Sequence, residues 1–139
     1  MARNRVRVAY QTTCTALRRH TSRNIMTHII DLLRYNPDKV LRMGNKPRNN
    51  VIELKPAPDE TKPGEMYALL GNGCTEFGII PFTLAGMKGE LFYDVNYLAR
   101  AEQEQLPIER NELAFCEFGH EWYGNIVLKR STISDTVYI

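Results

Sequence analysis

The 139-residue sequence has no long apolar run. Its uninterrupted hydrophobic stretches are only a few residues long, whereas a helix needs about 18 consecutive apolar residues to cross a bilayer. We therefore expect no membrane span and no membrane partner. The composition is instead that of an average globular protein, with 43% hydrophobic and 24% charged residues. The length favours a single domain over residues 1–139.

Cysteine is scarce and irregularly spaced. Cys14, Cys74 and Cys116 are odd in number and far apart, unlike the paired cysteines of small secreted domains. This pattern predicts the reducing cytoplasm, or a virion assembled there, as the location of the protein. No CxxC or HxxxH motif is present, so no metal site is predicted. The four-residue spacing of Cys116 and His120 suits a helix, but the flanking pattern indicates strand and turn, which favours a buried cysteine beside a turn histidine.

Motifs for phosphate chemistry and for RNA recognition are also missing. Residues 71–73, Gly-Asn-Gly, lack the Walker and dinucleotide-binding patterns and indicate a turn. No RNP-type run of glycine and aromatic residues occurs. No cofactor is therefore predicted. The richest cluster for chemistry is His120 and Glu121 beside Trp122 and Tyr123, a combination that suits either an enzyme site or a protein interface.

The near-neutral total charge of +2 conceals two opposed blocks. Residues 1–48 hold eleven basic side chains against two acidic ones, a net charge of +9, and residues 49–139 hold seven against fourteen, a net charge of −7. Nine of the eleven basic residues in the first block are arginine, whose rigid donor fork suits phosphate or carboxylate. This asymmetry indicates a contact surface, although a basic block that folds against its own acidic part would also explain it.

Hydrophobic periodicity predicts a strand and then a helix near the start of the chain. Residues 4–10 alternate between apolar and polar side chains, which is typical of a half-buried strand. After Ser22 as the N-cap, six apolar residues occupy one arc of about 160° on a helix. These six are Ile25, Met26, Ile29, Ile30, Leu32 and Leu33.

A second, shorter helix is expected directly afterwards. Residues 36–38, Asn-Pro-Asp, resemble a helix start. Val40, Leu41 and Met43 would form the apolar face of this helix, and Gly44 would end it. Two helices at a tight corner resemble a helix-turn-helix, but the second one is too short to lie along a major groove.

The remainder of the chain favours strands. An edge strand is expected at residues 51–55, and the three prolines of residues 56–65 predict an exposed loop. Further strands are expected at residues 66–70, 77–84, 90–95, 113–118, 122–129 and 136–139. Pro81 marks its strand as an edge strand or a bulged strand. One helix is expected from Asp94 to about Gln105.

These elements predict an α+β fold in which one amphipathic N-terminal helix packs on a mostly antiparallel sheet. The chain would consist of a basic part (1–48), the exposed loop (56–65) and an acidic, strand-rich part (66–139).

The function predicted from these observations is a non-enzymatic binding or assembly module of viral or mobile-element type. Its basic N-terminal third would dock on an acidic partner protein or on another copy of the chain. One alternative is sequence-nonspecific binding to nucleic-acid phosphate, and a second is a small enzyme around His120 and Glu121. The residues expected to make contacts are Arg3, Arg5, Arg7, Arg18, Arg19, Arg23, Arg42, Trp122 and Tyr123.

Overall fold

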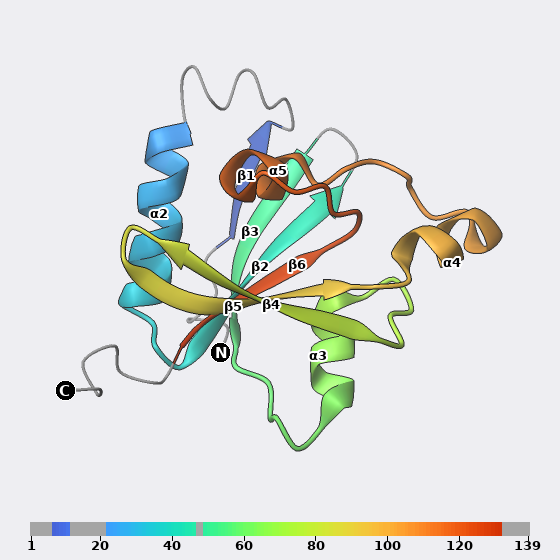
Figure 1. Cartoon of the computed structure of the whole chain (residues 1–139), viewed down its shortest axis with the longest axis horizontal. Helices are drawn as coiled ribbons and strands as arrows, with labels where there is room; N and C mark the ends of the chain where they lie inside the picture. Colours follow the sequence, from blue (N-terminus) through green and yellow to red (C-terminus); the bar gives the residue numbers. More distant parts are fainter. Residues whose placement is uncertain (1–6, 12–21, 47–48, 132–139) are drawn as a thin grey trace.

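The structure, a computed structural model, describes the backbone of residues 7–11, 22–46 and 49–131 and the side chains of residues 28–45 and 50–131. Its elements are shown in Figure 1. They are β1 (Arg7–Gln11), α2 (Ser22–Arg34), β2 (Lys39–Lys46), β3 (Asn49–Pro56), α3 (Pro63–Leu70), β4 (Phe77–Leu84), β5 (Met87–Asp94), α4 (Tyr97–Glu104), α5 (Glu112–Phe118) and β6 (Ile126–Arg130). Among these elements no helix is both long and apolar enough to cross a membrane.

The strands form one antiparallel sheet in the order β1-β3-β2-β6-β5-β4. Helices lie on both of its faces, and Figure 1 shows strands between α2 and α3. The larger core lies under α2 and α5, which contribute Ile29, Ile30, Leu33, Leu113 and Ala114 to it. The smaller core lies under α3 and consists of Val40, Met66, Leu70, Cys74, Phe92 and Val127. The fold is therefore α+β.

The predicted second helix at residues 40–43 is wrong, because this segment is the central strand β2. Leu41 and Met43 belong to the larger core, whereas Val40 belongs to the smaller core on the opposite face. A strand that is buried on both faces reads as a continuous apolar run without alternation. Residues 36–38, Asn-Pro-Asp, resemble a helix start, but the chain enters the strand β2 directly after them.

Four other local predictions are wrong in whole or in part. β3 is an inner strand between β1 and β2, not an edge strand. Residues 66–70 lie in α3, and residues 113–118 lie in α5. Both helices are only two turns long, so an apolar run of five or six residues in them could not be distinguished from a strand by periodicity. The predicted strand at residues 122–129 begins only at Ile126.

Other predictions agree with the described elements. β4 is the last strand of the sheet, as Pro81 indicated, and it pairs with β5 in a hairpin through Ala85 and Gly86. The helix expected after Asp94 is α4. Within the expected loop at residues 56–65, Pro56 ends β3 and residues 63–65 begin α3, so that residues 57–62 connect the two elements. Residues 4–6 and 136–139, and the side chains of Ile25 and Met26, lie outside the described part of the chain.

Three buried asparagines connect helices to the sheet, two of them at α5 and one at α3. Asn111 caps the helix by accepting a hydrogen bond from the Ala114 amide at 3.2 Å. Its Nδ2 donates to the carbonyl oxygens of Met43 and Gly124 at 3.2 and 3.0 Å. Asn50 donates to Asn111 Oδ1 at 3.0 Å. Since these amides are buried and bonded on several sides, they define both the start of α5 and the position of the loop that follows it. The third asparagine, Asn125, donates to the Leu70 carbonyl at 2.7 Å.

Candidate functional site

A hollow of about 360 Å³ lies between the edge strand β4 and the C-terminal half of α5. This volume falls in the range of about 300–1,000 Å³ that is usual for ligand sites. We call it the β4–α5 hollow. It is lined by Ile80, Pro81, Phe82, Thr83, Leu84, Leu91, Glu117, Phe118, His120 and Trp122.

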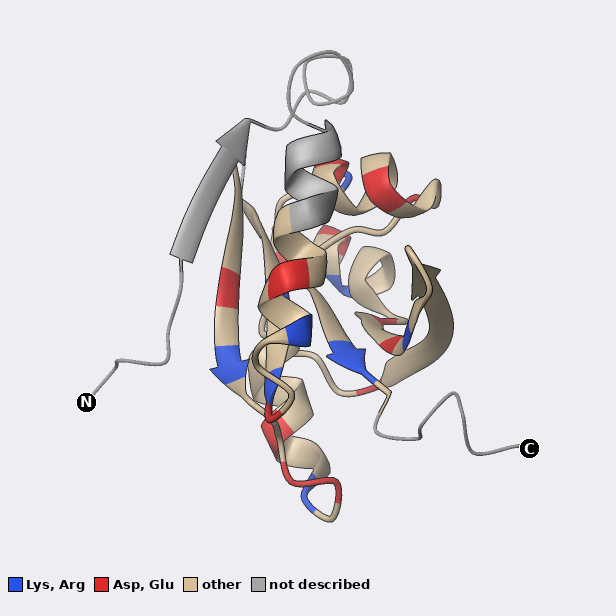
Figure 2. Ribbon diagram, turned by 90° about the vertical axis from the view of Figure 1, so that its left-hand side faces the viewer, with Lys and Arg blue, Asp and Glu red and all other residues tan. Residues whose placement is uncertain are grey.

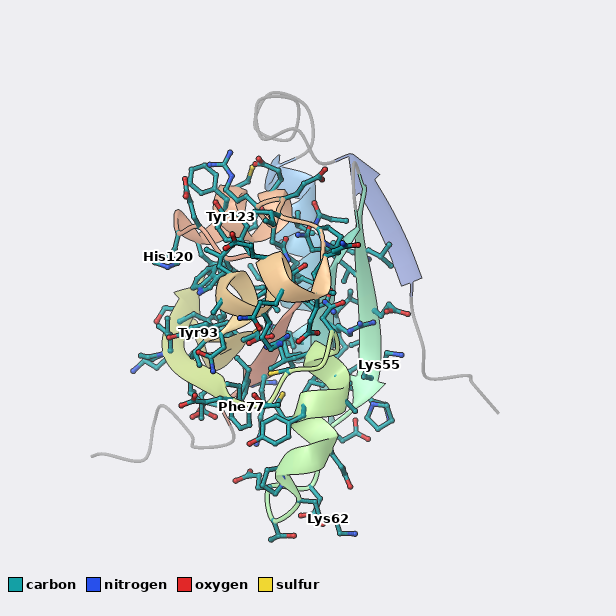
Figure 3. The ribbon with its side chains drawn as sticks, turned by 90° about the vertical axis from the view of Figure 1, so that its right-hand side faces the viewer. Lys55, Lys62, Phe77, Tyr93, His120 and Tyr123 are labelled. Atoms are coloured by element: carbon teal, nitrogen blue, oxygen red, sulfur yellow. The ribbon has the colours of Figure 1, made fainter. Side chains whose placement is uncertain are left out.

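Aromatic rings form one wall of this hollow. Phe118 contacts Phe82 and Trp122 edge-to-face, with ring centroids 5.7 and 6.3 Å apart. The Trp122 ring also lies 4.5 Å from the His120 ring and 6.1 Å from Tyr93. Figure 3 shows His120 and Tyr93 on the same side of the ribbon. Such ring contacts hold the wall in one arrangement and present apolar faces to an occupant.

Two polar groups at the β4–α5 hollow have no partner among the described residues. Glu117 is half-buried, and within the described part of the chain neither an ion pair nor a hydrogen bond stabilises its carboxylate. Burial raises the pKa of Glu117 from 4.5 to about 7, because the charged form is poorly hydrated there. Trp122 is only 7% exposed, and its indole Nε1 is buried without an acceptor. The site thus contains a half-buried carboxyl group with a raised pKa, which is a feature found at functional sites.

The local sequence explains how these side chains reach the hollow. α5 begins at the Asn111 cap and ends at Gly119, whose φ of 73° is left-handed and therefore suits glycine. The turn at Gly119 directs the chain back toward the helix, so that His120 and Trp122 lie close to Glu117 and Phe118 on one hollow.

The predicted pair of His120 and Glu121 is not joined in this site. His120 is exposed at the rim, whereas Glu121 does not line the hollow and accepts a hydrogen bond from Arg110 at 3.2 Å. Arg110 also binds Glu112 at 2.7 Å and lies 3.8 Å from the centre of the Phe115 ring. A histidine oriented by the neighbouring carboxylate is therefore not what the structure presents. The carboxyl group in the hollow is that of Glu117, which the sequence analysis missed.

The predicted contact arginines are only partly within the described residues. Arg3, Arg5, Arg18 and Arg19, and the side chains of Arg7 and Arg23, lie outside them. Arg42 lies under α3, where its Nε donates to the Leu69 carbonyl at 2.6 Å and its Nη1 to Glu53 at 3.0 Å. Its guanidinium is therefore engaged within the fold. Of the aromatic candidates, Trp122 lines the hollow and Tyr123 is half-buried, with its backbone bridged to Arg110.

The described side chains carry an excess of negative charge. They include fifteen acidic and ten basic residues, a net charge of −5, and Figure 2 marks the charged positions on the ribbon. Residues 101–121, which span the second half of α4 and all of α5, hold six glutamates and one arginine. Three of these glutamates have no ion-pair partner in the described part of the chain: Glu102, Glu109 and Glu117. We call residues 101–121 the acidic segment.

Two further hollows that border β4 and β5 are different in character. They share Glu60, Glu90 and Lys129, and Lys129 is already paired with Glu60 at 2.7 Å. Glu90 is exposed to solvent, so it needs no partner. The β4–α5 hollow is therefore the stronger candidate site.

Metal chemistry has no support within the described residues. They contain no group of three or more histidine, cysteine, aspartate or glutamate side chains that could hold an ion. Cys116 is disulfide-bonded, which the cysteine spacing did not predict, and its sulfur is not available as a thiolate ligand beside His120. No protein-family model, curated protein or solved structure matches the chain.

Proposed function

We propose that the chain is a non-enzymatic binding and assembly module that associates head-to-tail with other copies of itself. The basic block of residues 1–48 in one copy docks on the acidic segment of the next. Because the two contacting surfaces differ, such association closes into a ring or continues as a filament.

One observation carries the proposal: the acidic segment retains carboxylates that the described residues do not neutralise. Glu102 and Glu109 are exposed and unpaired. Arg42 is the one described member of the basic block that pairs with the acidic part of the chain, through Glu53. Residues 1–23 hold six arginines and no acidic residue. Complementary charge of this kind favours encounter and orients the partners.

The first test is the salt dependence of the oligomeric state. Mass photometry of the full chain should detect oligomers at about 20 mM salt and dissociation toward about 500 mM, since salt screens exposed charges. A monomer at every salt concentration would refute the proposal. A gel shift with DNA or RNA at low salt, without self-association, would favour the nucleic-acid alternative.

The second test uses complementary variants. One variant replaces Arg3, Arg5, Arg18 and Arg19 by glutamine, and the other is E102Q/E109Q. Each variant alone should be monomeric at low salt, and their mixture should form a heterodimer, because one intact basic block then meets one intact acidic segment. The control is K62Q/K88Q, which changes exposed charges outside both surfaces and should associate like the wild type.

A further inference from the structure

The β4–α5 hollow offers a site for one particular kind of side chain. Its walls are apolar and aromatic, and a half-buried carboxyl group lies among them without a partner. A cation that entered would form a charge-assisted hydrogen bond with Glu117. Its stem would pack against Phe82 and Phe118, and a planar cation would gain a further attraction from the aromatic faces.

The same fold already combines these groups around one of its own arginines. The Arg110 guanidinium lies over the Phe115 ring and binds the carboxylates of Glu112 and Glu121. The β4–α5 hollow likewise contains aromatic rings and a carboxylate. An arginine bound there would therefore make contacts of the same kind as Arg110 makes. Arginine suits it better than lysine, because its planar fork both stacks on rings and binds carboxylates in two places.

We propose that the β4–α5 hollow receives an arginine side chain from the basic block of a second copy of the chain. This inference rests on the proposed head-to-tail association and names the position at which one arginine is held. The donor segment is residues 1–23, where six arginines occur with no acidic residue. A peptide segment also supplies backbone carbonyl oxygens, which accept hydrogen bonds, whereas a guanidinium only donates them.

Trp122 makes the proposal testable because it is the one tryptophan of the chain and lines the hollow. The probe is a synthetic peptide of residues 1–23 with Cys14→Ser, added to dilute full-length protein while tryptophan emission is recorded. The peptide should change the emission in a saturable way. The same peptide with its six arginines replaced by glutamine should bind at least about tenfold more weakly, since it lacks the cation.

Variants of the protein locate the contact. E117Q should weaken peptide binding at least about tenfold, since the buried carboxylate is lost. E90Q removes an exposed carboxylate on the opposite face of the sheet and should bind within about twofold of the wild type. Equal binding by E117Q and the wild type would overturn the inference.

The wild-type chain gives a measurement that does not depend on a variant. Because the free Glu117 has a pKa of about 7, binding should be about tenfold weaker at pH 6 than at pH 8. The other titratable group that lines the hollow is His120. Beyond it lie Arg110, Glu112 and Glu121 at α5 and its loop, and His28 and Asp31 on α2, while β4 carries no charged residue. Any pH dependence that persists in E117Q measures their contribution, and an unchanged pH dependence would contradict the role of Glu117.

Three final comparisons distinguish a failure of the arginine contact from a failure of the proposed self-association. If E117Q no longer binds the peptide but still forms salt-sensitive oligomers, both proposals stand and the arginine contact is one of several. If the peptide does not bind while the wild type still oligomerises, the hollow is not the arginine site and the proposed function survives. N-acetylarginine amide provides the free ligand, and binding as tight as that of the peptide would overturn the assignment to a second copy.

Discussion

Replacing Glu117 by glutamine should make the stability of this protein less sensitive to pH. Burial without a partner raises the pKa of Glu117 from 4.5 to about 7 in the folded state. A carboxyl group with a raised pKa favours folding while it is protonated. Its contribution is fully present below about pH 4.5 and is lost progressively as the pH rises to about 7. Above that pH, the folded protein holds an ionised and poorly hydrated carboxylate.

The size of this effect follows from the displacement of the pKa. Each pKa unit corresponds to about 1.36 kcal/mol, so the full displacement corresponds to at most about 3 kcal/mol. Part of the Glu117 side chain remains accessible to water, which reduces the effect to about 1–2 kcal/mol. E117Q should therefore be about 1–2 kcal/mol more stable than the wild type at pH 8. At pH 5 the two should be nearly equal, because the wild-type side chain is then protonated and similar in shape to glutamine.

Urea denaturation followed by far-ultraviolet circular dichroism at pH 5 and pH 8 measures the difference. The control is E90Q, in which an exposed carboxylate is removed and the stability difference from the wild type should not change with pH. A stability difference between E117Q and the wild type that is the same at both pH values would refute the reasoning. It would mean that water or another group solvates the carboxylate in the folded protein.

Three further substitutions test the internal packing by urea denaturation. Asn111→Ala removes the buried amide that caps α5 and binds two carbonyl groups. It should lower the free energy of unfolding by about 2–4 kcal/mol. A loss below about 1 kcal/mol would contradict the role of Asn111. Arg42→Met leaves the buried Glu53 without its closest cation and should lower the free energy of unfolding by about 3 kcal/mol. The double variant R42M/E53L should recover most of this stability. If it does not, the broken ion pair is not the cause of the loss. Gly124→Ala forces a Cβ to within 2.7 Å of the Tyr97 ring at a φ of 89° and should cost about 2 kcal/mol, so a neutral effect would exclude this contact.

The residue Pro81 by itself predicted that β4 could be a strand at the edge of the sheet. Pro81 has no N–H to donate, and it occurs in the strand that ends the sheet order. The connection between β4 and β5 lies at Ala85 and Gly86, where Gly86 has a φ of 84° that suits glycine in a tight turn. These features depend on the residues themselves, so they are visible without knowledge of the tertiary structure.

Segments whose environment is set by distant parts of the chain could not be predicted in this way. β2 is covered on both faces, so Val40 and Leu41 are equally buried and no alternation remains. α5 has only seven residues, and its clearest helical signal is the cap at Asn111. The strand expected at residues 113–118 gives no reason to place Glu117 beside His120 and Trp122, whereas α5 and the turn at Gly119 bring the three residues to one hollow. The β4–α5 hollow joins residues more than thirty positions apart, a contact that sequence periodicity does not contain.

The two parts of the proposed interaction should respond differently to salt. Glu102 and Glu109 are exposed, and charges in water are screened beyond a Debye length of about 10 Å at 0.1 M salt. Glu117 is half-buried in an apolar hollow, where salt screens its attraction to a bound guanidinium much less. Encounter between copies should therefore weaken steeply with salt, while the arginine contact, once formed, should hold at higher salt. In the proposed association, the basic block would bring copies together over a longer range, and the Glu117 carboxylate would determine where one arginine is held.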